Sequence, residues 1–146
     1  MKTIVLYYTF GGSSKAEAEK LANETGASLC RVEEKKKRGM LSAVLSGSPK
    51  AMKRVASEIK PIAYHLEEFE RIVIGGPIWA GYPAPAINAI LNALPHGKEV
   101  ELFFCSGGGD STKSVEGTKA LVEQKGCKLI SYRDVKTGQG MKKTKE

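Results

Sequence analysis

The chain has 146 residues, of which 41% are hydrophobic and 27% charged, a balance typical of globular domains and not of disordered or membrane proteins. Its formal net charge of +7 comes from two segments. Residues 35–60 hold eight Lys and Arg against one acidic residue, and residues 136–146 hold four against one. The remaining residues are mildly acidic, which argues against nucleic acid as a partner.

The N-terminus is not expected to be a signal peptide, because its apolar run at residues 4–6 ends after three residues. No stretch approaches the roughly 18 apolar residues of a membrane span. We therefore expect a cytoplasmic protein with one domain, residues 1–146, that ends in a basic tail over residues 136–146.

The first third of the chain predicts a strand, a helix and a second strand. Residues 2–8 are rich in β-branched and aromatic side chains, and their consecutive aliphatic residues indicate burial on both faces. A helix is expected next, because Ser14 and Glu17 have the spacing of a capping box and Gly26 suits a helix C-terminus. Residues 29–33 then predict a shorter strand.

The rest of the chain continues the alternation of helix and strand. Residues 41–45 suggest a short helix, and the apolar spacing over residues 48–59 predicts a longer one. Residues 71–76 form the clearest buried strand, which Pro77 is expected to end. Further elements are expected as a helix over residues 87–94, a strand over 99–105, a helix over 115–125 and a strand over 127–135.

Strands that alternate with helices at this spacing predict βαβ units, and hence an α/β fold with a doubly wound, five-stranded parallel sheet. In such sheets ligands bind at the carboxyl ends of the strands. Three loops of unusual composition follow strands here, and they are our candidates for the binding site.

The first of these loops, residues 9–14, is suited to a phosphate. It combines glycines with the hydroxyls of Thr9, Ser13 and Ser14 at the start of a helix, where backbone N–H groups and the helix dipole favour an anion. Neither a Walker loop nor G-x-G-x-x-G is present, so a monophosphate fits best. The alternative is a simple helix cap and turn.

The other two loops contribute an aromatic ring and backbone donors. Trp79, the only tryptophan, lies in the glycine-rich segment 75–83, where an aromatic ring left at a strand end can stack on a ligand. The alternative is that Trp79 turns inward and fills the core. The loop 106–111 offers several backbone N–H groups but is a weak signal by itself.

Together these loops resemble flavodoxins over nearly the whole chain. The family's first loop, close to T/S-x-T-G-x-T, binds the phosphate of flavin mononucleotide (FMN), and here Thr9, Gly12 and Ser14 match it while Gly11 replaces a hydroxyl residue. The resemblance implies the strand order 2-1-3-4-5. Typical members, unlike this chain, are acidic.

The resemblance also assigns the other loops. The segment Gly75-Gly76-Pro77-Ile78-Trp79 looks like G-[ST]-P-x-[WY], whose ring lies on the isoalloxazine, and the Ala80-Gly81 peptide would lie beside N5. Many flavodoxins have a second aromatic residue in the loop that corresponds to 106–111, but this chain has none there. Tyr82, from the neighbouring loop, is the candidate substitute. The implied flavin-binding residues are Thr9, Phe10, Gly11, Gly12, Ser13, Ser14, Pro77, Ile78, Trp79, Ala80, Gly81, Tyr82, Ser106, Gly107, Gly108, Gly109 and Asp110.

The family's C-terminal helix is expected to be missing, because the 11 residues after Val135 include Gly138 and Gly140. One sheet face would then stay thinly covered, and the apolar surface left open predicts a homodimer. The basic residues 35–60 are either a solvated surface or a docking site for an acidic redox partner.

No catalytic constellation is evident, and Asp110 is expected to cap its loop. Cys30, Cys105 and Cys127 lack metal-ligand spacing and are expected to be buried free thiols, and His65 and His96 to lie at the surface. The leading functional hypothesis is an FMN-binding electron carrier. The alternatives are an FMN-dependent NAD(P)H:quinone-type oxidoreductase, or a flavin-free interaction module with the same fold.

Overall fold

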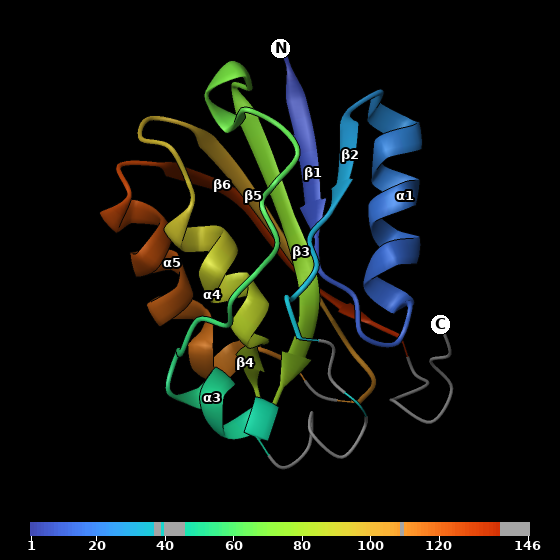
Figure 1. Ribbon diagram of the computed structural model, residues 1–146, viewed down its shortest axis with the longest axis vertical. Coiled ribbons are helices and arrows are strands. Elements are labelled where there is room, and N and C mark those ends of the chain that lie inside the picture. Colours follow the sequence, from blue (N-terminus) through green and yellow to red (C-terminus); the bar gives the residue numbers. More distant parts are fainter. Residues whose placement is uncertain (37–38, 40–45, 109, 138–146) are drawn as a thin grey trace.

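The computed structural model describes residues 1–36, 39, 46–108 and 110–137. Its sheet has five parallel strands in the order β2-β1-β3-β5-β6, with a short β4 paired antiparallel to the end of β3 (Figure 1). The predicted order is therefore confirmed, with β4 as an addition. The strands are β1 (Thr3–Tyr7), β2 (Ser28–Arg31), β3 (Arg71–Trp79), β4 (Tyr82–Pro83), β5 (Glu99–Ser106) and β6 (Lys128–Lys136). The helices are α1 (Ser13–Thr25), α3 (Ser48–Met52), α4 (Pro85–Asn92) and α5 (Val115–Gln124), with short 3-10 helices η2 (Leu66–Glu68) and η3 (Thr112–Ser114).

The central strands are buried on both faces, as their continuous aliphatic runs predict. In β1, Ile4 and Leu6 belong to the larger core, which lies under α4. Val5 and Tyr7 point to a smaller core on the opposite face, where Ala18 of α1 packs. Alternate residues of one strand thus supply two cores, and helices on both faces are needed to close them (Figure 1).

The predicted helix over residues 48–59 is wrong beyond Met52, where α3 ends. Arg54 has a left-handed backbone with φ 56°, and its guanidinium donates hydrogen bonds of 2.9 Å to Thr118 Oγ1 and to Ser114 O. These contacts stop the helix, so that Val55 is 42% exposed instead of lying on a buried helix face. The helix suggested over residues 41–45 lies outside the described residues.

The prediction that Pro77 ends its strand is also wrong. β3 continues through Pro77, which pairs with Cys105 of β5, as far as Trp79. Proline has no N–H to donate, but the Pro77 carbonyl accepts a hydrogen bond of 3.1 Å from the N–H of Ala84. The segment expected to be a loop is therefore a hairpin of β3 and β4.

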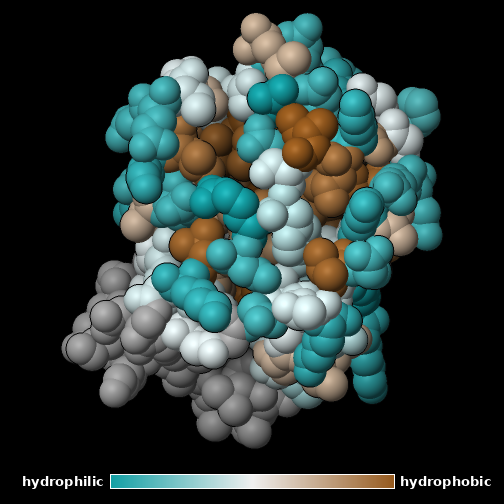
Figure 2. Space-filling model, turned by 180° about the vertical axis from the view of Figure 1, so that it is seen from behind, coloured by the Kyte–Doolittle hydropathy of each residue, from teal (hydrophilic) through white to brown (hydrophobic). Residues whose placement is uncertain are grey.

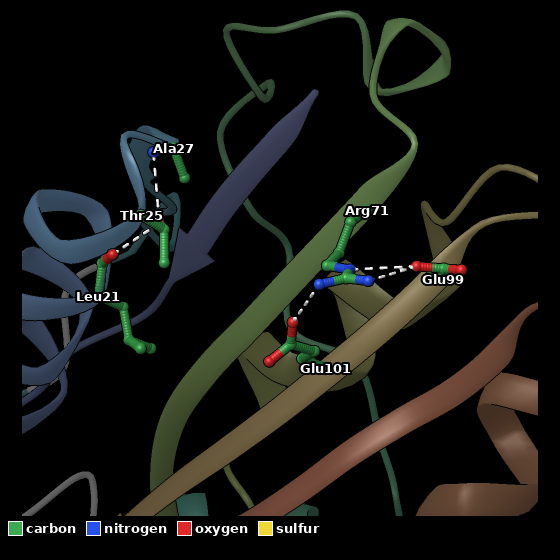
Figure 3. A network of polar contacts seen from close by, with 6 residues as sticks. All are labelled: Leu21, Thr25, Ala27, Arg71, Glu99 and Glu101. Carbon is green, nitrogen blue, oxygen red and sulfur yellow. Dashed lines mark hydrogen bonds and ion pairs between the residues drawn. The ribbon is translucent and has the colours of Figure 1, made fainter. Parts of the chain in front are cut away.

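The rear face of the sheet beside α1 carries several charged side chains. Arg71 of β3 donates to Glu99 at 2.7 Å and pairs with Glu101 at 3.4 Å (Figure 3). The guanidinium of Arg133 lies 5.9 Å from the ring centroid of Phe103, which is only 1% exposed. In Figure 2 the hydrophobic areas of this face are accordingly separated by hydrophilic ones.

Charged side chains also lie next to the apolar surface that was expected to stay open near β6. Among the described residues of β6, Ile130 is the large aliphatic side chain that is clearly exposed, at 36%. Arg133 also forms an ion pair of 2.9 Å with Glu17 of α1, which extends the polar cover toward that helix. The homodimer itself stays a prediction, and residues 138–146, where the missing helix was inferred, lie outside the described residues.

No helix in the described part of the chain is long and apolar enough to cross a membrane.

Candidate functional site

A cavity opens at the carboxyl ends of β1, β3 and β5, where the three candidate loops meet. Its volume is about 80 Å3, and its lining combines hydroxyl groups on one side with apolar side chains on the other. Two strands that neighbour each other in the sheet, β1 and β3, leave this edge toward helices on opposite faces, which is the usual ligand position in such folds. The lining residues are Thr9, Phe10, Gly11, Ser13, Ser14, Pro77, Ile78, Trp79, Cys105, Ser106, Gly107 and Thr137.

The first loop is folded as a turn that presents the start of α1 to the cavity. Thr9 Oγ1 accepts a hydrogen bond of 3.0 Å from the N–H of Gly12, which holds the loop closed. Gly12 caps the helix with φ 104°, a conformation that favours glycine. No side chain caps α1 and its first turn has no acidic residue, so the positive end of the helix is available to an anion.

The predicted capping box of Ser14 and Glu17 is wrong. The helix begins one residue earlier, at Ser13, and Ser14 is only 2% exposed within its first turn. Its hydroxyl is hydrogen-bonded to the thiol of Cys105, while Glu17 pairs with Arg133 at 2.9 Å. Both side chains thus bind partners on β5 and β6 and not the helix backbone.

Cys105 is a buried thiol at the base of the cavity. Burial raises its pKa, and the hydrogen bond from Ser14 offsets that rise only in part. The thiol is therefore protonated near neutral pH. All three cysteines are free and buried, as predicted, and the described residues contain no group of three metal-ligating side chains.

Trp79 forms part of the cavity wall and also part of the core. It is 6% exposed and packs edge-on against Tyr8, with ring centroids 6.2 Å apart, and against Phe10, at 5.7 Å. Trp79 thus belongs to the core, as the second alternative held, and also lines the cavity, while its stacking on a ligand stays a prediction.

The glycines before Trp79 serve sheet packing. A Cβ atom at Gly75 would overlap the ring of Phe103, and one at Gly76 would overlap the side chain of Ile87. A side chain at either position would push apart the layers that place Trp79 at the cavity.

The residues after Trp79 do not line the cavity. Ala80 and Gly81 form the hairpin turn with φ 55° and 86°, and the Gly81 carbonyl accepts a hydrogen bond of 2.7 Å from Ser114 Oγ. Tyr82, the candidate second aromatic, faces the cations of Arg54, 5.4 Å from its ring centroid, and Lys113, at 5.7 Å.

The third loop contributes Ser106 and Gly107 to the cavity, but not Gly108 or Asp110. Asp110 instead accepts a hydrogen bond of 3.0 Å from the N–H of Thr112, which lowers the pKa of its carboxyl group. The expectation of a loop-capping role is confirmed. Gly109 lies outside the described residues.

Thr137 is a lining residue that sequence reasoning missed, and Cys105 lines the cavity although it was not among the predicted binding residues. Thr137 follows β6, and its N–H donates a hydrogen bond of 2.9 Å to Ser106 O. No sequence signal marks Thr137, because it reaches the cavity only through the pairing of β6 with β5. Cys105 was placed at a strand end, which was a usable signal.

A larger groove of about 380 Å3 lies elsewhere, along residues 59–67. Lys35 and Lys60 line it, and its lining lacks the serine and threonine hydroxyls and the start of α1 that border the first cavity. His65, predicted to lie at the surface, borders it and is exposed, as is His96. We therefore place the candidate site at the smaller cavity.

Comparison with known proteins agrees with this geometry. A family model described as flavodoxin matches residues 2–144. The crystal structure of a flavoprotein from Lactobacillus acidophilus in complex with FMN is 26% identical, with a TM-score of 0.76 over 91% of this chain and 92% of that one. The structure of a Bacteroides uniformis protein, 22% identical, shares the fold with a TM-score of 0.81 over 99% and 95% of the two chains. An uncharacterized protein of Archaeoglobus fulgidus is 25% identical over 89% of this chain and 82% of its own length. The match of the family model to nearly the whole chain shows that this protein belongs to the flavodoxin family.

Proposed function

We propose that this protein binds FMN at the cavity and works as a one-domain electron carrier. The observation that carries the proposal is the uncapped start of α1, which meets the hydroxyls of Thr9 and Ser13 on one side of a cavity whose other side is the Trp79 wall. Such a site offers donors for a phosphate and an aromatic surface for a ring.

The donor set fits the phosphate of FMN. Thr9 and Ser13 carry hydroxyl donors, and the first turn of α1 adds backbone N–H groups without any carboxylate to repel an anion. The cavity of about 80 Å3 is smaller than a flavin nucleotide, so it would enclose only part of one. One phosphate suits one helix start, which favours FMN over FAD.

Bound FMN would supply the electron chemistry, and the chain would supply binding, orientation and control of access. Phe10 and Trp79 give the cavity its apolar wall, and Thr9 holds the phosphate loop closed through Gly12. Burial raises the pKa of Cys105 and so keeps a neutral thiol, with no added negative charge, at the cavity.

The second candidate function is an FMN-dependent NAD(P)H:quinone-type oxidoreductase. Steady-state kinetics separate it from a carrier. A carrier loaded with FMN should pass electrons to cytochrome c after chemical reduction, and should consume NAD(P)H with a quinone no faster than free FMN does. Sustained turnover above that level would favour the oxidoreductase.

The partner we propose is an acidic redox protein. The exposed Lys50 and Lys53 lie on and beside α3, and Met52 between them is 50% exposed. Arg54 joins this segment to the β3–β4 hairpin through its contact with Tyr82. Cations around an exposed apolar side chain near the site suit an acidic surface, which would raise the association rate.

A further inference from the structure

A buried hydrogen bond lies directly behind Trp79. Tyr8 contacts Trp79 edge-on, with the ring planes at 78°, and the Tyr8 hydroxyl donates a hydrogen bond of 2.7 Å to Glu34 Oε1. Tyr8 and Glu34 are each 6% exposed, and neither lines the cavity. The pair therefore stands one layer behind the wall that Trp79 forms.

The backbone around Glu34 is held from two sides. Glu34 forms an isolated antiparallel bridge with Ile59. The backbone N–H of Lys35 donates to the carbonyl of residue 58 at 3.0 Å, and the N–H of Lys60 donates to the carbonyl of residue 33 at 2.8 Å. On the side of the sheet, the N–H of Val32 donates to the carbonyl of Tyr7 at 2.7 Å. The Glu34 carboxylate is thus an acceptor at a fixed place behind the sheet edge.

Stability alone is a poor explanation for this pair. Tyr8 and Trp79 belong to the larger apolar core, where a hydrophobic pair of similar volume would often be as stable as a buried polar pair. A polar contact in an apolar core fixes orientation instead, because a ring held at its far end by a hydrogen bond cannot rotate freely. Orientation is what matters for a ring in a binding wall.

Two aromatic rings of the described residues contact Trp79 edge-on. Tyr8 meets it from behind, and Phe10, which lines the cavity, meets it at 87°. We propose that Tyr8 and Glu34 are positioning residues whose hydrogen bond fixes the plane of Trp79 and thereby the shape of the cavity wall. The effect on ligand binding rests on the proposed binding of FMN, whereas the effect on Trp79 does not.

The lone tryptophan makes the proposal directly measurable. Emission and near-ultraviolet circular dichroism of Trp79 report its surroundings without interference from another tryptophan. We expect Tyr8→Phe and Glu34→Leu to change both signals in the ligand-free protein and to raise the Kd for FMN about five-fold, equivalent to ~1 kcal/mol. Glu34→Gln, which keeps an acceptor for the hydroxyl, should retain the wild-type signals and Kd.

Tyr7→Phe is the matched control, because Tyr7 is also buried but points into the smaller core on the opposite face. It should change neither the Trp79 signals nor the Kd for FMN. Unfolding curves of all variants fix a temperature at which each is folded, so that loss of stability is not read as loss of binding.

The proposal is overturned if Tyr8→Phe or Glu34→Leu leaves the Trp79 signals or the Kd unchanged, or if Tyr7→Phe produces the same changes. If the wild-type protein does not bind FMN, the proposed function fails. The spectra of Trp79 without ligand then decide the positioning claim by themselves.

Discussion

Ser111 is bound by both oxygens of the Asp134 carboxylate: its hydroxyl donates to Oδ1 at 2.6 Å and its backbone N–H to Oδ2 at 3.3 Å. Ser111 is fully buried, and its hydroxyl also contacts the Tyr132 hydroxyl. The end of the loop 106–111 is thereby fixed to β6, the strand that leads to Thr137 in the cavity wall.

Removing this anchor should loosen the loop. We expect Asp134→Ala to lower the free energy of unfolding by about 1–3 kcal/mol, because it leaves the buried N–H of Ser111 without its acceptor and removes one partner of the Ser111 hydroxyl. Urea unfolding measures the change. Asp134→Asn, which keeps one acceptor oxygen, should lose less. Equal stability of Asp134→Ala and the wild type would show that the carboxylate does not hold the loop.

Trp79→Ala should affect both folding and binding. We expect FMN binding to weaken by roughly 1–3 kcal/mol through loss of the stacking surface. The free energy of unfolding should fall by about 3–5 kcal/mol, since the side chain is also buried in the core. Flavin titration and urea unfolding separate the two. A lower stability with an unchanged Kd for FMN would mean that Trp79 serves the core alone.

Most of the fold follows from local sequence signals. The aliphatic runs of β1 and β3 identified buried parallel strands, and Gly26 marked the end of α1, where it has φ 73°. Gly12 and its neighbours identified a loop that opens α1 beside the cavity, while its binding of a phosphate stays a prediction. These features succeed because each depends on residues close together in the chain.

The errors arose where distant contacts decide local structure. Helix periodicity beyond Met52 was overridden by the hydrogen bonds of Arg54 to α5 and η3. Ser14 had the spacing of a helix cap but binds Cys105 on another strand. Thr137 was missed because only its pairing with Ser106 brings it to the cavity. None of these partners can be assigned from spacing along the chain.

The basic segment should control association with a redox partner. We expect the double change Lys50→Glu and Lys53→Glu to slow reduction of the FMN-loaded protein by a reduced acidic ferredoxin about ten-fold at low salt. Stopped-flow absorbance measures the rate. FMN affinity should not change. The matched control changes two exposed lysines outside this segment, Lys119 and Lys128, to Glu. An equal decrease of the reduction rate for both double variants, or no decrease for either, would contradict a docking role for residues 50–53.

The pKa of Cys105 predicts a pH dependence of stability. Because burial raises the pKa of the folded thiol above its ordinary value of 9.0, the unfolded chain loses this proton first as the pH rises. Above that pH the folded state binds more protons than the unfolded chain. The contribution of Cys105 to the free energy of unfolding is therefore fully present below pH 9 and is lost as the pH rises above it. Urea unfolding of the ligand-free protein at pH 8 and pH 10 should show a smaller decrease for Cys105→Ala, and identical decreases would contradict the assignment.

Binding of FMN in preference to riboflavin tests the central claim most directly, because the two ligands differ only in the phosphate that the start of α1 is proposed to hold. Titration followed by quenching of flavin fluorescence gives both dissociation constants, and mass spectrometry of any flavin released by heat identifies a ligand bound during expression. We predict one FMN per chain, at least ten-fold weaker binding of riboflavin, equivalent to ~1.4 kcal/mol, and FMN as the released ligand. Equal affinities for the two flavins, release of FAD, or no binding of FMN would contradict the account.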